Sequence, residues 1–158
     1  MSEQYHIRIA NDSLMFSAAH FITFDDGTCE PLHGHDYHVI VELAGPLGEG
    51  SYVVDFLAVQ AAVREILAAL DHRVLLPGQH VTSDAQEITV RLKESRWVFP
   101  LSNCQVLDIP NTTSEMLARW IGRQLLEKLA CHPHEASIEI REGSGHSAVW
   151  RSGPISFS

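Results

Sequence analysis

Basic side chains are scarce in this chain. It has 11 Lys and Arg residues against 20 Asp and Glu residues, which gives a formal net charge of −9 at neutral pH. Nucleic-acid binding depends on clustered Lys and Arg side chains that neutralise phosphates, so this balance argues against DNA or RNA as the main partner. The same charge balance is compatible with a small phosphorylated substrate held by a few local basic residues.

Cysteine pairs and targeting segments are also missing. The three cysteines are an odd number, and no two of them have the CxxC spacing. This usage predicts a reduced, cytosolic protein. The first four residues lack the basic segment and apolar run of a signal peptide, and no apolar stretch reaches membrane-spanning length. We therefore expect a cytoplasmic protein that does not bind membranes.

Internal repeats, low-complexity tracts and linkers are absent as well. A length of 158 residues, 45% of them hydrophobic, fits one globular domain over residues 1–158 with a core of ordinary size.

The hydrophobic periodicity predicts strands and two helices. Alternation predicts strands at residues 5–11, 14–21 and 35–43, and a final antiparallel pair at 136–141 and 148–151. Asp55 is the expected N-cap of a helix over 56–70, and Thr112 and Glu115 have capping-box spacing at the start of a second helix. Between the helices, residues 78–110 form an arm with an expected hairpin at 88–92 and 97–99. This order predicts an α+β fold with both helices on one face of an antiparallel sheet.

The stretch from Cys29 to Tyr37 holds the strongest chemical signal. His33 and His35 flank Gly34, and side chains two residues apart on an extended segment point the same way. Neutral imidazole is a common zinc ligand, and His20, at the end of an apolar segment, is the candidate third ligand. Two such histidines also occur as plain exposed strand residues, so the residues alone leave both interpretations open.

Other candidate residues flank these histidines or follow predicted elements. Cys29 precedes the histidine pair and is close enough to act as a nucleophile or base beside a metal. Asp71 and His72 follow the first helix, where such a pair is either a surface cap or a proton shuttle. Glu142 lies at the mouth of the last predicted turn, where a charge is usually solvated.

Several short segments, taken in their order along the chain, resemble the 6-pyruvoyl-tetrahydropterin synthase and 6-carboxy-tetrahydropterin synthase family. The resemblance rests on residues 16–20, Cys29-x-x-x-His33-Gly-His35-x-Tyr37, residues 54–56, 70–72 and 110–115, and Glu142. It implies the tunnelling fold (T-fold), in which subunits join their sheets into a β-barrel, usually as a homohexamer of two stacked trimers. The active sites of such an assembly lie between subunits.

The resemblance implies roles for most of these residues. It makes three histidines the ligands of Zn²⁺, namely His20, His33 and His35. Cys29 becomes the base that abstracts a proton, with Asp71 and His72 as its relay. Glu142 becomes the anchor of the pterin ring, in a pocket lined by the pair Thr112 and Thr113.

The resemblance also implies a substrate, 7,8-dihydroneopterin triphosphate, and two alternative products. Loss of triphosphate gives the 6-pyruvoyl compound, and side-chain cleavage with loss of acetaldehyde gives 6-carboxy-tetrahydropterin, a precursor of queuosine-type deazapurines. The Cys-x3-His spacing is more similar to the carboxy-forming members. A third type, serving folate synthesis, carries Glu where Cys29 stands. Glu30 is one position out of register with it, so we discount this type here.

Two alternatives from other classes stay open. One is a non-catalytic pterin-binding member of the fold, against which the joint presence of Cys29, Asp71 and His72 argues. The other is a cupin-like oxygenase that uses the two histidines to hold iron, for which the residues after His35 do not supply the usual further ligand. The arm at 78–109 is longer than in the leanest members of the family, and its role is not readable.

Overall fold

The computed structural model describes residues 3–130 and 133–153. Its elements, in chain order, are β1 (Tyr5–Ile9), β2 (Met15–His20), β3 (His33–Gly45), α1 (Phe56–Ala68), β4 (Arg73–Pro77), β5 (Val81–Ser83), β6 (Glu87–Leu92), β7 (Ser95–Pro100), the 3-10 turn η1 (Leu101–Asn103), β8 (Cys104–Leu107), α2 (Ser114–Lys128), β9 (Glu135–Glu142) and β10 (His146–Ser152). The predicted strands and both predicted helices are present. In the described part of the chain, no helix is long and apolar enough to cross a membrane.

The main sheet is built around β3. It has the order β10-β9-β3-β2-β4-β8, and β1 also pairs with β3. The pairings of β3 with β1, β2 and β9 are antiparallel, as predicted. However, β4 joins β2 in parallel and β8 joins β4 in parallel, so the expected antiparallel sheet has a parallel extension. Parallel neighbours need a crossover connection, and α1 provides one before β4.

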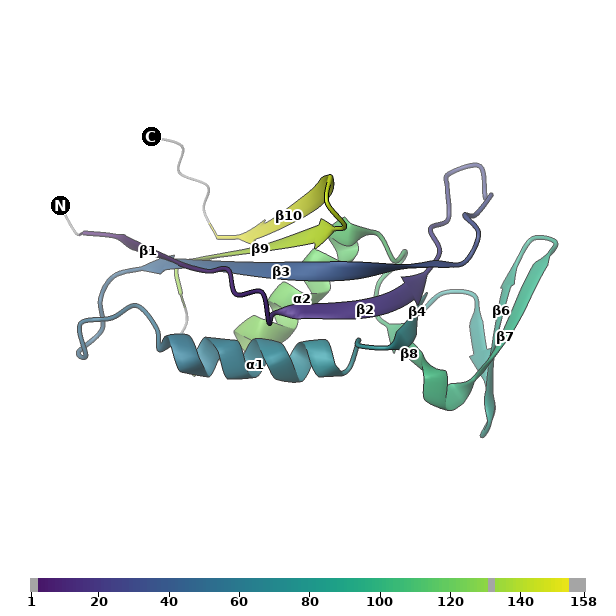
Figure 1. The fold of residues 1–158 in the computed structure, drawn as a ribbon, viewed down its shortest axis with the longest axis horizontal. Helices are drawn as coiled ribbons and strands as arrows, with labels where there is room; N and C mark the ends of the chain where they lie inside the picture. The colour runs from purple at the N-terminus through teal and green to yellow at the C-terminus, as the bar shows by residue number, and fades with distance from the viewer. Residues whose placement is uncertain (1–2, 131–132, 154–158) are drawn as a thin grey trace.

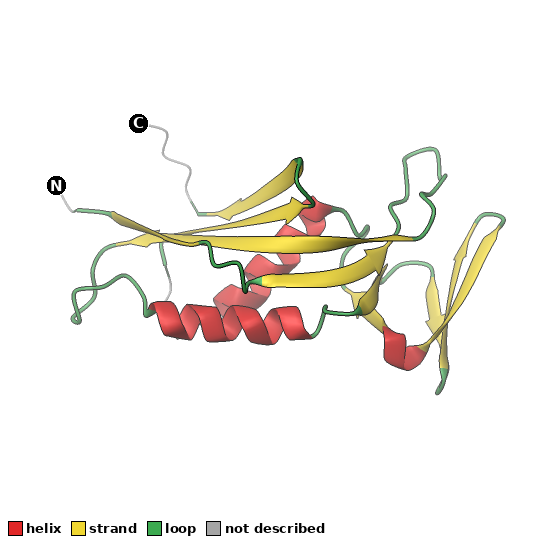
Figure 2. Cartoon of the chain, in the orientation of Figure 1, coloured by secondary structure: helices red, strands yellow, loops and turns green. Residues whose placement is uncertain are grey.

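Both helices cover one face of this sheet (Figures 1 and 2). Alternate residues of β3 bury their side chains in the same core as buried residues of both helices. This core cluster contains Tyr37, Val39, Val41 and Leu43 of β3, Val59 and Val63 of α1, and Leu117 and Ile121 of α2. The face under the helices is the inner face of the sheet, and towards the start of β3 the apolar side chains give way to His33 and His35.

The helix starts show one success and one error of sequence reasoning. Asp55 caps α1 as predicted, and its carboxylate accepts a hydrogen bond from the Leu57 backbone N–H at 2.8 Å. The capping-box prediction at Thr112 is wrong, because Thr113 is the N-cap of α2 and accepts from the Met116 N–H. Thr112 is one residue too early and is completely buried, and its hydroxyl donates to the Phe21 carbonyl at 2.9 Å.

The arm forms a small sheet of its own, in the order β5-β6-β7. The predicted hairpin is confirmed as β6 and β7, with the turn reduced to Lys93 and Glu94. A second core cluster lies beneath it and contains Phe21, Leu76, Ile88 and Val90. Figure 1 shows this hairpin beside the loop between β2 and β3.

Candidate active site

Three histidines meet on the inner face because of strand register. In the antiparallel pairing of β2 and β3, His20 lies opposite His33, and Ala18 lies opposite His35. Since side chains alternate along a strand, His20, His33 and His35 project to the same face. Their ring centroids are 4.7–5.3 Å apart. The structure therefore brings together the three residues that the sequence singled out as metal ligands.

Glu142 joins these histidines from a third strand. It pairs with Tyr37 in the register of β3 and β9, and its Oε1 lies 2.9 Å from His35 Nε2. One ligand atom each from His20, His33, His35 and Glu142 lie within 4.8 Å of one another. We call these four residues the His/Glu cluster. The proximity of Glu142 to the histidines was not foreseen, because it depends on a pairing between distant segments.

The hydrogen bonds of two histidines leave the other ring nitrogen free for a ligand. His20 Nδ1 lies 2.8 Å from the Thr112 carbonyl oxygen, and His33 Nδ1 lies 2.8 Å from the Pro31 carbonyl oxygen. A carbonyl only accepts, so each Nδ1 carries the hydrogen and each Nε2 keeps its lone pair. Metal-binding histidines are usually oriented by such a bond.

The environment of His20 fits a metal ion. The side chain is completely buried, and its Nε2 has no hydrogen-bond partner among the described residues. Burial lowers the pKa of His20 and favours the neutral form that binds metals. An unsatisfied buried acceptor costs about 1–3 kcal/mol. A metal ion held by the His/Glu cluster would use this lone pair, so the cluster can bind a metal.

Glu142 is held in place by two hydroxyl groups. Ser114, the first residue of α2, donates to Glu142 Oε2 at 3.1 Å, and the Tyr37 hydroxyl lies 3.5 Å from Oε1. Burial and the neighbouring Glu142 carboxylate raise the pKa of Tyr37, so its hydroxyl keeps its proton and can donate. This arrangement fixes the carboxylate toward the histidines.

The predicted pterin contacts Thr112 and Thr113 lie beside the cluster. The Thr112 carbonyl accepts the bond from His20, while its hydroxyl bonds to Phe21. The Thr113 hydroxyl accepts from the Met116 N–H at 3.3 Å. Both hydroxyls thus have partners within the chain, and the lining of a pterin pocket by this pair stays a prediction.

Asp71 and His72 form a preorganised pair at the start of β4. Asp71 Oδ2 lies 2.8 Å from His72 Nδ1, and Asp71 Oδ1 accepts from the Ser17 backbone N–H at 2.9 Å. The bond from Ser17 is the main reason that the pKa of Asp71 is lowered. His72 has a φ of 56°, in the left-handed region that residues with a side chain seldom adopt, and its side chain is 82% exposed. Strain of this kind often marks functional positions.

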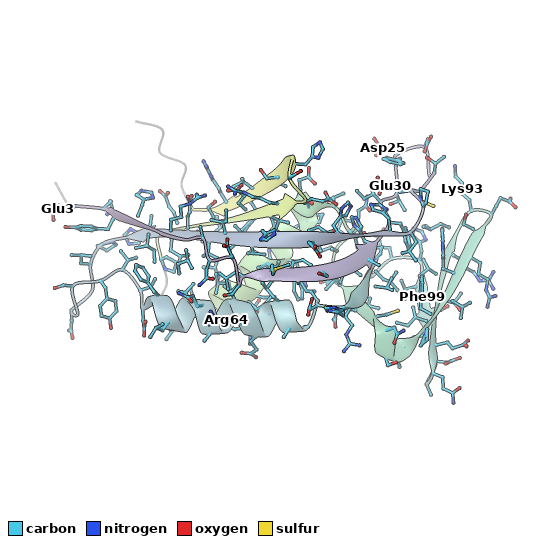
Figure 3. The ribbon with its side chains drawn as sticks, viewed as in Figure 1. Glu3, Asp25, Glu30, Arg64, Lys93 and Phe99 are labelled. Carbon is cyan, nitrogen blue, oxygen red and sulfur yellow. The ribbon has the colours of Figure 1, made fainter. Side chains whose placement is uncertain are left out.

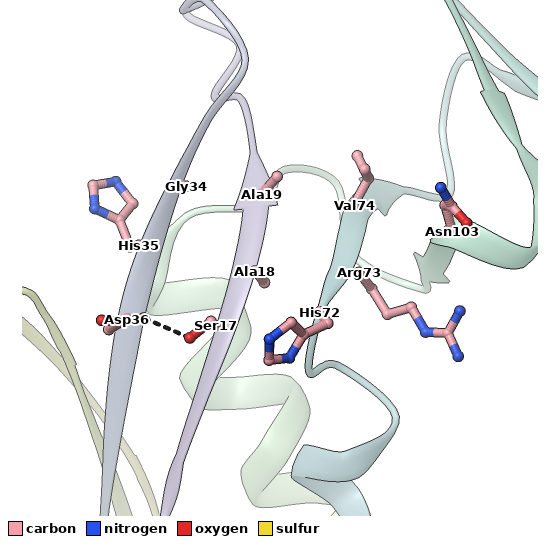
Figure 4. A pocket seen from close by; sticks show the side chains of 10 residues that line it. All are labelled: Ser17, Ala18, Ala19, Gly34, His35, Asp36, His72, Arg73, Val74 and Asn103. Carbon is pink, nitrogen blue, oxygen red and sulfur yellow. Dashed lines mark hydrogen bonds between the residues drawn. The ribbon is translucent and has the colours of Figure 1, made fainter.

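A cavity of about 500 Å³ runs past this pair. Figure 4 shows it bordered by His35 and Asp36 of β3, by Ser17 of β2, and by His72 and Arg73 across β2. Two of its lining residues are hydrogen-bonded to each other, with the Ser17 hydroxyl donating to Asp36 at 2.5 Å. In the main sheet, β2 lies between β3 and β4. His35 and His72 therefore border the cavity on opposite sides of β2.

Cys29 lies apart from Asp71 and His72. It is half-buried against the second core cluster and pairs with Thr23 in an isolated bridge. Within residues 3–130 and 133–153, no hydrogen bond or ion pair joins it to Asp71 or His72. In one chain, the candidate base therefore makes no direct polar contact with its candidate relay.

Glu30 has a position that sequence reasoning missed. Its Oε2 lies 3.8 Å from His33 Nε2 and 3.3 Å from the Ile22 backbone nitrogen. The carboxylate thus reaches the edge of the His/Glu cluster. The only sequence signal was its adjacency to Cys29, and the direction of the side chain depends on the fold of the loop.

The model of the 6-pyruvoyl tetrahydropterin synthase family matches residues 10–152. The chain belongs to this family. A Methanocaldococcus jannaschii protein named as a putative 6-carboxy-5,6,7,8-tetrahydropterin synthase is 33% identical over 147 residues, covering 87% of this chain and 90% of the relative. The 6-carboxy-5,6,7,8-tetrahydropterin synthase of Haemophilus influenzae is 31% identical over 116 residues, covering 70% and 76%.

Solved structures of the synthase family share the fold. The 6-pyruvoyl tetrahydropterin synthase of Plasmodium vivax superposes with a TM-score of 0.88 at 24% identity, covering 97% of this chain and all of that one. The Plasmodium falciparum enzyme gives 0.86 at 26% identity, covering 96% and 99%. The predicted T-fold is therefore confirmed, and this tetrahydropterin synthase family member is an enzyme of the lyase type.

Proposed function

We propose that the protein is a zinc-dependent lyase that converts 7,8-dihydroneopterin triphosphate to 6-carboxy-5,6,7,8-tetrahydropterin, in a pathway to queuosine-type deazapurines. The observation that carries the proposal is the buried Nε2 of His20, which has no hydrogen-bond partner among the described residues, lies 3.4 Å from Glu142 Oε1 and stands beside His33 and His35. The Cys-x3-His spacing and the names of the relatives favour the carboxy product. The enzyme is a single pterin-synthase-like domain over residues 1–158, is cytoplasmic, and binds neither nucleic acid nor membranes.

The inner face binds the metal and the substrate in this proposal. His20, His33 and His35 would hold Zn²⁺, and the bound metal would supply Lewis-acid chemistry at the side-chain hydroxyls of the substrate. The Glu142 carboxylate accepts from the 2-amino group and the ring N–H of the pterin, which present two donors side by side. Ser114 keeps the carboxylate aimed at them. Thr112 and Thr113 line this pocket.

Proton transfer is assigned to the remaining residues. Cys29, as the thiolate, would take the proton from a side-chain carbon of the substrate. His72 then receives it at Nε2, because Nδ1 is bonded to Asp71, and the Asp71 carboxylate stabilises the resulting imidazolium. Among the described residues, Cys29 has no hydrogen bond or ion pair to Asp71 or His72, and this supports a relay across a subunit boundary. We therefore propose a homohexamer of two stacked trimers.

Product analysis tests this function. Zinc-loaded protein is incubated with 7,8-dihydroneopterin triphosphate, and products are identified by mass spectrometry beside Cys29→Ala and the matched control Cys104→Ala. We expect 6-carboxy-tetrahydropterin and acetaldehyde from the wild type and from Cys104→Ala, and neither from Cys29→Ala. Formation of the 6-pyruvoyl compound instead would support the same active site but assign a different reaction to it. No turnover by a zinc-replete oligomer would overturn the enzyme assignment for this substrate and favour a pterin-binding protein.

The position of Glu30 favours a second candidate function, the folate-type cleavage of the same substrate. In two variants of the Plasmodium vivax 6-pyruvoyltetrahydropterin synthase, a catalytic glutamate is replaced by alanine or by cysteine. In this chain Glu30 Oε2 reaches to 3.8 Å from His33 Nε2, so Glu30 could serve as a second base beside Cys29. Glu30→Gln should then remove one product and leave the Cys29-dependent product in place. An unchanged product mixture in Glu30→Gln would rule this function out.

A further inference from the structure

The tip of the β6–β7 hairpin touches the loop that carries Cys29. Lys93, in the hairpin turn, donates from Nζ to the Asp26 carbonyl. Its side chain also lies against Gly27, where an added Cβ would come within 2.5 Å of Lys93 Cε. Figure 3 shows Lys93 at the hairpin tip, beside the loop with Asp25 and Glu30. The loop thus has a specific contact at its own tip.

A second contact holds the base of the same loop. Trp97 of β7 stacks on Phe21, with ring centroids 4.8 Å apart and an interplanar angle of 15°. Phe21 directly follows His20 and is almost completely buried. Cys29 packs into the same cluster. The hairpin therefore contacts both the tip of the loop and the ends that carry His20 and Cys29.

Backbone hydrogen bonds join the two halves of the loop, so a displacement of its tip would also displace Cys29. The Phe24 N–H donates to the Thr28 carbonyl at 2.8 Å, and the Glu30 N–H donates to the Ile22 carbonyl at 2.9 Å. The bridge between Thr23 and Cys29 lies between these two bonds. The segment is therefore a small hairpin in its own right.

The geometry of the hairpin turn indicates that its contacts are specific. Lys93 has a φ of 49°, which is unfavourable for a residue with a side chain and is usual for Asn or Gly in a two-residue turn. Gly27, its contact, has a φ of 77° and no Cβ. The chain contains only two lysines, and the other, Lys128, lies at the end of α2, where it pairs with Glu65 at 2.7 Å.

We propose that the β6–β7 hairpin is a brace for the loop that carries Cys29, with Lys93 and Trp97 as positioning residues for the reaction. The inference rests on the proposed role of Cys29. Neither residue contacts the His/Glu cluster in the described structure, so the brace sets the place of the thiol and leaves the metal ligands alone. A base displaced by about 1 Å can lose about 10²-fold in rate.

The first test uses Lys93→Met, which keeps the length of the side chain and removes the donor. Lys93→Arg is the conservative variant, and Lys128→Met is the matched control. Two readouts are compared, the kinetic constants and the rate of alkylation of Cys29 by iodoacetamide, followed by peptide mass spectrometry so that Cys104 is scored separately. Zinc content and thermal unfolding are measured for each variant.

We expect Lys93→Met to lose roughly tenfold in kcat, with KM and zinc content unchanged. The alkylation rate of Cys29 should change several-fold and that of Cys104 should not, and Lys93→Arg should restore both readouts. If Lys93→Met and Lys128→Met have the same kcat and the same rate of Cys29 alkylation, the proposed role of the hairpin as a brace is wrong. If the wild type turns over no pterin, the proposed function fails, yet the alkylation rates still decide whether Lys93 positions Cys29.

A second pair of variants guards against a folding defect in Lys93→Met. Trp97→Leu removes the stack on Phe21 while the cluster stays apolar, and Phe99→Leu is its control in the same strand and cluster. We expect the selective change in Cys29 alkylation for Trp97→Leu alone. The same change in both variants would mean that general packing, and not the contact with Phe21, is responsible, and the role of Trp97 would be wrong.

Discussion

His20 and His33 face each other across the β2–β3 pairing, with ring centroids 4.8 Å apart. The loop of residues 21–32 joins them, so their meeting depends on register. A slip of one residue would turn one of the two strands over and move its histidines to the outer face. The positions of the histidines therefore depend on the register between β2 and β3.

Removal of one of these histidines should abolish metal binding. His33→Ala leaves two imidazoles where a catalytic zinc site has three protein ligands. We expect its zinc affinity to fall by more than the ~10–100-fold that the loss of a supporting hydrogen bond costs. Competition with a chelator and elemental analysis measure this, with His6→Ala, an exposed histidine of β1, as the control. Equal zinc contents in the two variants would refute the assignment.

Glu142→Gln separates an anchor of the substrate from a metal ligand. An amide has one acceptor and presents an NH₂ group, so it cannot accept both donors of a pterin ring. We expect zinc content to stay the same while kcat/KM falls by about 10²-fold or more. Glu139→Gln, three residues earlier and on the outer face of β9, is the control. Loss of zinc from Glu142→Gln would instead make Glu142 a ligand.

Thr112→Val should destabilise the protein although the two side chains have nearly the same shape. The change leaves the Phe21 carbonyl, deep in the structure, without its donor, at a cost of about 1–3 kcal/mol. Urea unfolding measures the free energy of unfolding. Thr82→Val in the exposed part of β5 should stay within about 0.5 kcal/mol of the wild type. If the two variants are equally stable, the buried bond contributes nothing.

Asp71 should make stability depend on pH in acid. The bond from Ser17 lowers its pKa in the folded state below the unfolded value of about 3.9. Its contribution is therefore complete above that value and is lost as the pH falls through the folded pKa. Because the side chain is 42% exposed, we expect less than about 1 kcal/mol.

Urea unfolding between pH 3 and pH 7 checks this contribution. The difference in stability between the wild type and Asp71→Asn should be present at pH 5 and shrink below pH 4. Asp12→Asn, in the turn before β2, is the control. A difference that is as large at pH 3 as at pH 7 would show that the Asp71 charge is not involved.

Local patterns in the sequence determined much of this protein. The spacing of His33 and His35 fixed their common direction, because side chains alternate along any strand. Asp55 marked the start of α1, and the 78–110 region showed its hairpin, because caps and alternation involve only neighbouring residues. The ordered landmarks were enough to identify the family.

The tertiary structure alone decided how these pieces meet. It placed Glu142 opposite Tyr37, turned the Glu30 carboxylate toward His33, and set Lys93 on the loop of Cys29. It also made β4 and β8 parallel to β2 and, among the described residues, left Cys29 without a hydrogen bond to the Asp71–His72 pair. Most of these contacts join residues from segments that are distant in the sequence, so no short stretch contains both residues of such a contact. The contacts depend on which strands are neighbours in the sheet and which faces are buried together. The packing of the whole core determines both.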